Sequence, residues 1–167
     1  MISFLRCLGI LNAAVWFGSA IFFTVAVAPA VFSGEMKTLL GGNNYPYFSG
    51  AIAQMIFNHF FFKIQLTCSM LALIHLLLER LYFGRFLDTW RVPLLGFLVI
   101  VTLLGGFVAR RRLEHLHAIK YAPNTTPAMR EAASQSFRAW HGASQIANVF
   151  VLIGLGIYVC RIGKRPD

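Results

Sequence analysis

Four long apolar stretches, separated by shorter polar segments, run through the chain at residues 8–32, 56–78, 92–108 and 139–160. A helix needs roughly 20 mostly apolar residues to cross the hydrocarbon core of a bilayer. The stretches are apolar on most sides, as in LTCSMLALIHLLL, and they lack the short alternating segments of a membrane β-barrel. The pattern therefore predicts an all-α fold, a bundle of four transmembrane helices in up-down-up-down order.

We expect a single integral membrane domain over residues 1–167, with spans at about 5–32, 54–79, 92–112 and 135–160. Residues 33–50 contain the turn formers GGNNYPYFSG and are predicted to form a loop, and residues 84–91 a short link. The segment RLEHLHAIKY is predicted to continue the third helix into water until APNTTP ends it. The first span resembles a signal peptide, but its apolar run is too long for one, so we expect an uncleaved helix.

The composition is consistent with lipid as the main solvent. Of the 167 residues, 57% are hydrophobic and 13% are charged, whereas soluble domains carry about 25% charged residues. The net charge of +9 does not indicate nucleic-acid binding, because the basic residues lie at the ends of the apolar spans, where they anchor helices and meet anionic head groups. We therefore expect the lipid bilayer, and no nucleic acid, as a partner.

Four spans place both termini and the link on one side of the membrane, called here the terminal side, and the loops after the first and third spans on the loop side. The basic residues divide evenly between the two sides, so the positive-inside rule gives a tie. Those on the terminal side lie in the shortest segments, where the rule is strongest. We therefore expect cytoplasmic termini in a bacterial inner membrane.

Polar side chains recur inside the apolar spans, where an unpaired polar group is costly. Two sets of these side chains each share one helical face. One interpretation is that they form hydrogen bonds across helices and fix the register, at about 0.6–2 kcal/mol each. The other is that they line a polar path or a small-molecule pocket. The sets are His141, Ser144, Gln145 and Asn148 in the fourth span, and Gln54, Asn58, Gln65 and Ser69 in the second.

Lys63 is the formal charge within an apolar span, and it is predicted to lie about one turn from the loop side. Its stem can then extend to the head groups; the alternative is a buried lysine that contacts a ligand. Near the same side, His59 and His141 fall at similar depth on different helices. Helical bundles hold haem and metals through inward histidines. This pair is therefore the candidate for haem b or copper, and Arg110 is available for a haem propionate.

His115 and His117 form a second histidine pair, but on a regular helix they point about 200° apart, which argues against joint metal binding. The chain has no Ser/His/Asp arrangement, no paired carboxylates and no phosphate-binding glycine loop, so we do not expect an enzyme. The candidate ligand or cofactor residues are His59, His141, Lys63, Arg110, Gln65, Ser144 and Asn148.

Two motifs resemble the transmembrane-protein-205-like family. WFGSAIFFTVAVAPAVF resembles that family's first helix, and FRAWHGASQIAN resembles its last helix. The resemblance implies a small four-helix membrane protein from a family that is largely of unknown function. The matching residues are Trp16, Gly18, Phe22, Ala28, Pro29 and Phe32 in the first motif, and Phe137, His141, Gly142, Ser144 and Asn148 in the second.

Three functions remain open from the sequence. The first is a non-enzymatic accessory subunit, packed against other membrane subunits or forming a homo-oligomer, or a bundle that binds a small solute. The second is a membrane protein that binds haem b or copper through histidines. The third is a small transporter or channel with a polar path through the bundle.

Overall fold

The computed structural model describes residues 2–83 and 90–163, which form four long helical rods and one short helix. Each of the first three rods contains one π-helical turn, labelled η. The rods are α1 (Ile2–Phe22), η1 (Phe23–Val27) and α2 (Ala28–Val31); α4 (Tyr45–Phe60), η2 (Phe61–Gln65) and α5 (Leu66–Phe83); α6 (Arg91–Leu103), η3 (Leu104–Ala109) and α7 (Arg110–Tyr121); and α8 (Pro127–Gly163). The short helix is α3 (Gly34–Leu40).

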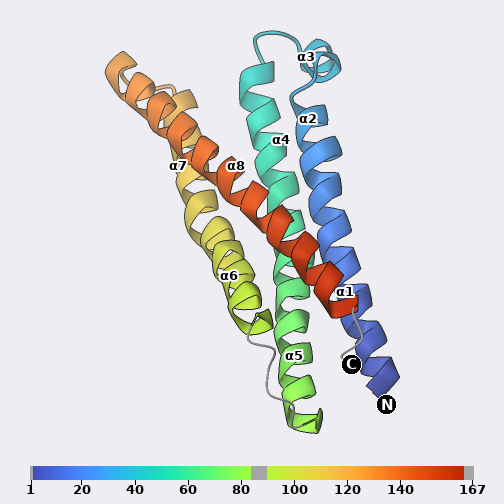
Figure 1. The fold of residues 1–167 in the computed structure, drawn as a ribbon. Coiled ribbons are helices and arrows are strands. Elements are labelled where there is room, and N and C mark those ends of the chain that lie inside the picture. Colours follow the sequence, from blue (N-terminus) through green and yellow to red (C-terminus); the bar gives the residue numbers. More distant parts are fainter. Residues whose placement is uncertain (1, 84–89, 164–167) are drawn as a thin grey trace.

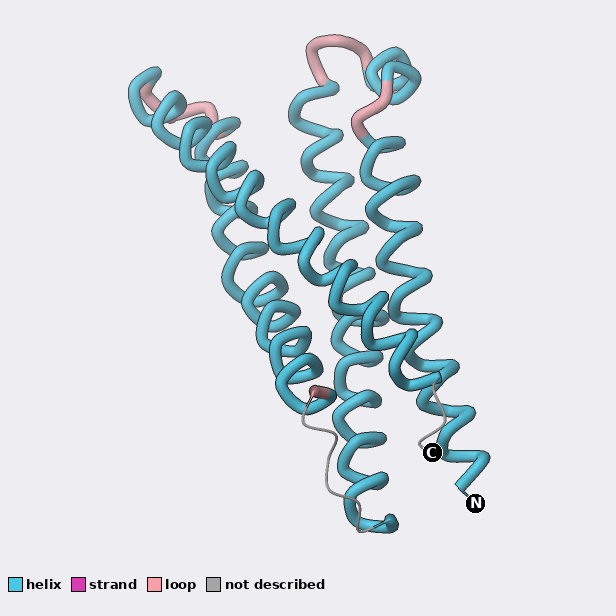
Figure 2. Tube along the Cα trace, viewed as in Figure 1, coloured by secondary structure: helices cyan, strands magenta, loops and turns pink. Residues whose placement is uncertain are grey.

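The predicted four-helix bundle is confirmed. Four helices are long and apolar enough to cross a membrane, and no strand occurs among the described residues. Figures 1 and 2 show the rods running up and down, with α1 beginning and α8 ending at the same end, and with the described loops at the ends of the bundle. The chain is an integral membrane protein with four transmembrane helices.

The loop predicted over residues 33–50 is wrong in two places. Helix α3 forms within it because Ser33 caps the helix, its side chain accepting a hydrogen bond from the Met36 N–H at 3.2 Å. Helix α4 begins at Tyr45 with Pro46 in its first turn, where proline is favourable because the first N–H groups of a helix have no partner within it. The link predicted at residues 84–91 lies mostly outside the described residues.

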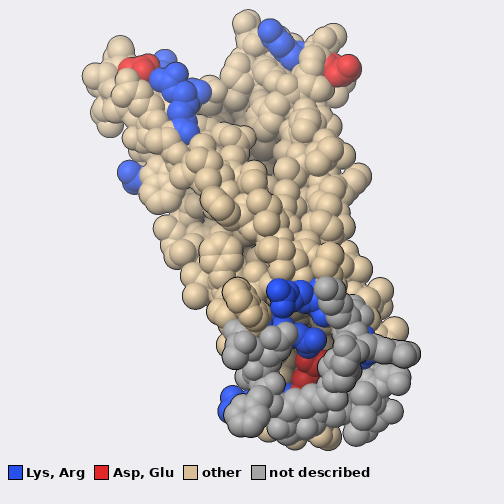
Figure 3. All heavy atoms as spheres, viewed as in Figure 1, with Lys and Arg blue, Asp and Glu red and all other residues tan. Residues whose placement is uncertain are grey.

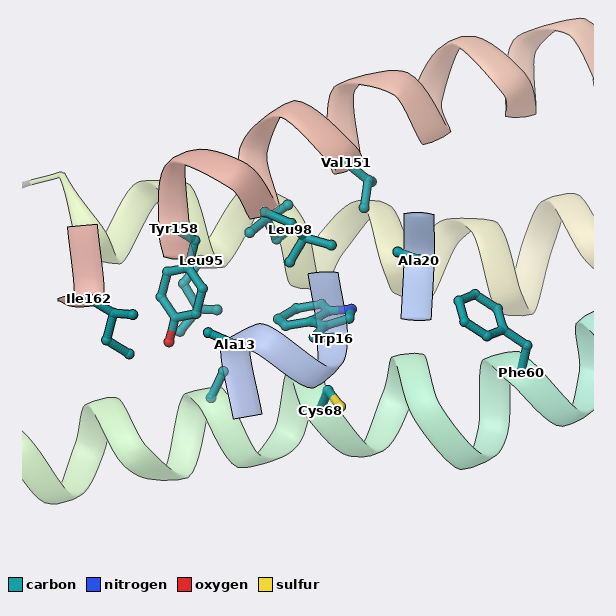
Figure 4. Close-up of a cluster of buried hydrophobic side chains, with 12 residues drawn as sticks. Ala13, Trp16, Ala20, Phe60, Cys68, Leu95, Leu98, Val151, Tyr158 and Ile162 are labelled. Carbon is teal, nitrogen blue, oxygen red and sulfur yellow. The ribbon is translucent and has the colours of Figure 1, made fainter. Parts of the chain in front are cut away.

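The centre of the bundle is mostly apolar and closely packed. Trp16, Leu95, Leu98 and Leu155 are fully buried where all four rods meet. Figure 4 shows side chains from α1, α5, α6 and α8 converging on this cluster. Large apolar side chains elsewhere face outward, and Val25, for example, is 69% exposed. Lipid rather than water covers such a surface, so the core is small for a chain of this size.

Polar side chains inside the spans form hydrogen bonds between rods. The Trp16 indole N–H donates to Gln65 Oε1 at 2.7 Å. The Asn12 amide donates to the carbonyl of Cys68 at 2.9 Å. Both bonds join the first rod to the second and set their register, because water is absent from the hydrocarbon as an alternative partner.

Helix α8 crosses the bundle diagonally (Figure 1). Near its start it packs along α7, and farther on it packs against α1. The Asn148 amide donates to Thr24 Oγ1 at 2.9 Å, which joins α8 to η1. On the loop side of this bond, α8 diverges from the first rod and follows α7. The crossing therefore leaves the loop end of the bundle open.

The second and third rods are antiparallel neighbours over their loop-side halves. The Tyr121 hydroxyl donates to the carbonyl of Pro46 at 3.0 Å, and Arg110 donates to Asn58 Oδ1 at 3.1 Å. Farther into the membrane, Gly106 faces the ring of Phe61, which is 1% exposed. The absence of a side chain at Gly106 allows this close approach of η2 and η3.

The third rod is longer than a membrane is thick. The 13 residues of α6 and 6 of η3 rise roughly 28 Å, about the thickness of the hydrocarbon core. The 12 residues of α7 then add about 18 Å. Figure 3 shows the charged side chains gathered toward the two ends, with a broad band between them that is almost free of charge. Helix α7 therefore extends past the hydrocarbon on the loop side.

We expect Gly106→Ala to destabilise the bundle, because its Cβ would lie 1.9 Å from ring atoms of the buried Phe61. Overpacking of this kind costs about 1–3 kcal/mol. Gly105→Ala is the matched control, because a Cβ there meets nothing within 4 Å. Thermal unfolding in detergent should show a lower midpoint for Gly106→Ala alone. Equal midpoints for the two variants would contradict this packing.

Candidate functional site

A pocket of about 330 Å³ lies at the loop end of the bundle. The second, third and fourth rods line it together with Phe32, the residue that follows the first rod, because it occupies the space left where α8 diverges from the first rod. Most of its lining is aromatic or apolar, with a few polar groups, as is usual for small-molecule sites. The lining residues are Phe32, Tyr45, Pro46, Ser49, Gly50, His117, Lys120, Tyr121, Phe137 and His141.

The pocket has a buried base and an open rim. Ser49 is 2% exposed and His117 is 7% exposed, whereas Phe32 is 51% exposed. His141 is also exposed. The space-filling view shows the corresponding hollow between two lobes at the loop end (Figure 3). A ligand can therefore enter at Phe32 and His141 and reach the base without a change in the fold.

The base of the pocket contains a polar atom without a partner. His117 Nε2 is buried and has no hydrogen bond within the described part of the chain. The imidazole lies against Gly50 of α4, where a Cβ would be 2.4 Å from Nε2. Buried polar atoms are nearly always paired. A ligand that donates to or accepts from this nitrogen would satisfy it.

Aromatic rings hold His117 in place. Its ring stacks on Tyr47 with the ring centroids 5.5 Å apart and lies 4.8 Å from that of Tyr121. The Phe137 ring contacts both His117, at 6.4 Å, and His141, at 5.9 Å. The Tyr45 hydroxyl donates to the carbonyl of Phe32 at 3.0 Å and so ties α4 to the end of the first rod. The pocket wall is therefore largely preformed.

The charge that lines the pocket is positive. Lys120 is the charged side chain among the lining residues, and its Nζ lies 5.2 Å from the centroid of the Tyr121 ring. The nearby helix α3 carries Glu35, whose backbone N–H and the Ser33 hydroxyl lower the pKa of its carboxyl. Glu35 is exposed and does not line the pocket. An anionic ligand group would therefore meet Lys120 without an opposing carboxylate in the wall.

Arg110 is the first residue of α7 and lies about two turns closer to the membrane centre than His117. It belongs to a polar cluster that is separate from the pocket. It donates to Asn58 Oδ1 at 3.1 Å and to Glu114 Oε1 at 2.9 Å, and its Nε donates to the carbonyl of Gly106 at 2.8 Å. The Asn58 amide donates to Glu114 Oε1 at 3.1 Å. These contacts tie the second rod to the third, and Arg110 does not line the pocket.

Of the seven predicted ligand or cofactor residues, His141 is the one that lines the pocket. Gln65 and Asn148 form hydrogen bonds between rods, and Ser144 donates to the carbonyl of His141 in its own helix at 2.7 Å. His59 and Lys63 are exposed, on α4 and η2. His59 and His141 do not meet in the pocket.

The described residues contain no group of three or more His, Cys, Asp or Glu side chains able to hold a metal ion. His115 is exposed and His117 is buried, so the two point to different sides of α7. The polar side chains predicted for one face of the second span serve two neighbouring rods, since Asn58 contacts the third rod and Gln65 the first. The π-helical turn η2 begins between them and rotates the face.

Sequence reasoning missed His117 as a pocket residue, although a usable signal was present. Arg110, Glu114, His117 and Tyr121 recur at spacings of four, three and four residues, which places them on one face of α7. All four contact the second rod or the pocket. The other lining residues come from distant segments, so their proximity follows from the path of α8.

These features define the class of protein, a small integral membrane protein whose four helices enclose a pocket at the loop end. Residues 11–122 match the family described as a domain of unknown function, DUF4149, and the chain belongs to that family. The match covers most of the first three rods and ends before α8. Comparison with curated proteins and with solved structures gave no match.

We expect Gly50→Ala to displace the His117 imidazole, because the new Cβ would lie 2.4 Å from Nε2. The cost in unfolding free energy should be about 1–3 kcal/mol. NMR of protein with ¹³C-labelled histidine rings should show new positions for the His117 signals. In the control Gly142→Ala, where a Cβ meets nothing within 4 Å, those signals should not move. Unchanged His117 signals in Gly50→Ala would be inconsistent with this contact.

Proposed function

We propose that this protein is a non-enzymatic binding protein, which holds a small molecule in the pocket at the loop end of the bundle. The observation that carries the proposal is the unpaired His117 Nε2 at the buried base of a preformed aromatic pocket. The ligand has an apolar or aromatic body that fits between Phe137 and Tyr121, and a polar group that reaches His117.

The packing below the pocket favours binding over conduction. Trp16, Leu95, Leu98 and Leu155 fill the middle of the bundle and leave no exposed surface there. Polar side chains in this region pair with one another in the Trp16–Gln65 and Asn148–Thr24 bonds, whereas the buried Thr102 Oγ1 has no hydrogen bond among the described residues. These features support a ligand that enters and leaves on the same side of the membrane.

Three further statements belong to the proposal. The short basic segments of the terminal side support cytoplasmic termini, and we place the protein in a bacterial inner membrane, where it packs against other subunits or further copies of itself.

The motifs at Trp16 and Asn148 support a relationship to the transmembrane-protein-205-like family. Both residues form interhelical hydrogen bonds here, which is a physical reason for such motifs.

The proposal predicts site-specific binding of 1-naphthol, a probe with an aromatic body and one hydroxyl. The chain has five histidines, so ¹³C-labelled imidazoles in nanodiscs of zwitterionic lipid give a simple NMR spectrum. We expect saturable shifts at His117 and His141, while the signals of His59, His75 and His115 stay in place. Linear shifts of all five signals, or no shift at His117, would refute binding in the pocket.

A matched pair of serine variants tests whether the pocket volume is needed. The hydroxyls of Ser49 and Ser144 both donate to a carbonyl of their own helix, at 2.6 and 2.7 Å, but only Ser49 lines the pocket. We expect Ser49→Leu to weaken 1-naphthol binding by about tenfold or more, equivalent to about 1.4 kcal/mol. Ser144→Leu should bind as the parent protein does. An absorption spectrum of the purified protein tests the haem alternative separately.

A further inference from the structure

We infer that the ligand is an anionic amphiphile, with a carboxylate or phosphate head and an alkyl tail, and that it enters the pocket sideways from the loop-side leaflet between the first rod and α8. This inference rests on the proposed function and specifies its ligand. Three independent features of the loop end support it: the charge of the lining, the depth of the pocket and the position of its opening.

The charge of the lining favours an acidic head. Lys120 and His117 lie one turn apart on α7 and both line the pocket, and none of the lining residues is acidic. The Lys120 ammonium supplies a charge-assisted hydrogen bond to the acidic head, and His117 Nε2 lies one turn away as a further hydrogen-bonding group. A cationic head would find Lys120 and no carboxylate to compensate for it.

The pocket lies at the water-facing edge of the head-group layer. The third rod runs for roughly 28 Å between Arg91 and Arg110. His117 and Lys120 lie two to three turns beyond Arg110, or about 10–15 Å farther out. Aromatic side chains of the kind that line the pocket are typical of this zone. The head-group layer is roughly 5–8 Å thick on each side, so His117 lies near its outer edge and an amphiphile must rise toward the water to bring its head to Lys120.

The opening of the pocket faces the gap between α8 and the end of the first rod. The Asn148–Thr24 bond closes these two rods together. His141 lies two turns back from Asn148, toward the start of α8, and both His141 and Phe32 line the pocket and are exposed. Phe32 follows the last residue of a membrane-spanning rod. The head of an amphiphile can therefore occupy the base while its tail passes Phe32 toward the acyl chains.

The test compares three probes that share a ten-carbon tail: decanoate, decanol and decyltrimethylammonium. The measurement is the saturable shift of the His117 imidazole signals in zwitterionic nanodiscs. We expect decanoate to reach half-saturation at about one-tenth of the decanol concentration and the cationic probe to bind weakest. Lys120→Gln should remove the advantage of decanoate over decanol. Lys37→Gln, an exposed lysine of α3 outside the pocket, should leave it unchanged.

The source of the acidic head is resolved by nanodiscs that contain phosphatidylglycerol. His117 signals already shifted in such discs, with no further response to decanoate, identify a bilayer phospholipid; a retained response identifies a free acid. Equal binding of decanoate and decanol, or tighter binding of the cationic probe, would overturn the inference that the ligand has an anionic head. Saturable binding of 1-naphthol would then still support the pocket as a binding site. No His117 response to any of these probes would overturn both proposals.

Discussion

The structure depends on one constraint, that a polar group within the hydrocarbon must find its partner inside the protein. Water is absent as an alternative, so a polar group whose partner lies on another rod commits the two rods to a definite register. Trp16 and Gln65 do this for the first and second rods, and Asn148 and Thr24 do it for the first and fourth. The apolar core adds close packing, but shape alone leaves apolar helices free to slide.

The same constraint accounts for the position of the pocket. Asn148 holds α8 against the first rod near the middle of the membrane, while the loop after α7 keeps the start of α8 beside the third rod. Helix α8 must therefore cross the bundle, and the helices cannot all remain in contact at the loop end. The space that results lies beyond the hydrocarbon. There, a ligand with oxygen atoms can form a hydrogen bond with the buried imidazole of His117.

Sequence patterns were sufficient for the fold because the length and polarity of each span are local properties. They also located Gln65 and Asn148 as polar groups that need partners. They did not locate the pocket, since Phe32, Gly50 and His117 come together only through the diagonal path of α8. Helix α3 was missed because glycine and serine around residues 33–34 indicate a turn, although Ser33 also serves as a helix cap. The π-helical turns leave no visible trace in apolar periodicity.

Those three wide turns separate each of the first three rods into two halves with different rotational phase. An i to i+5 turn accommodates one extra residue, which swings the following side chains by about a quarter of a revolution. In the second rod, Asn58 precedes η2 and contacts the third rod, whereas Gln65, the last residue of η2, contacts the first. The inner halves supply most of the apolar core cluster, and Phe60 joins it from the end of α4. The lining of the outer half can thus diversify without rearranging the part that spans the lipid.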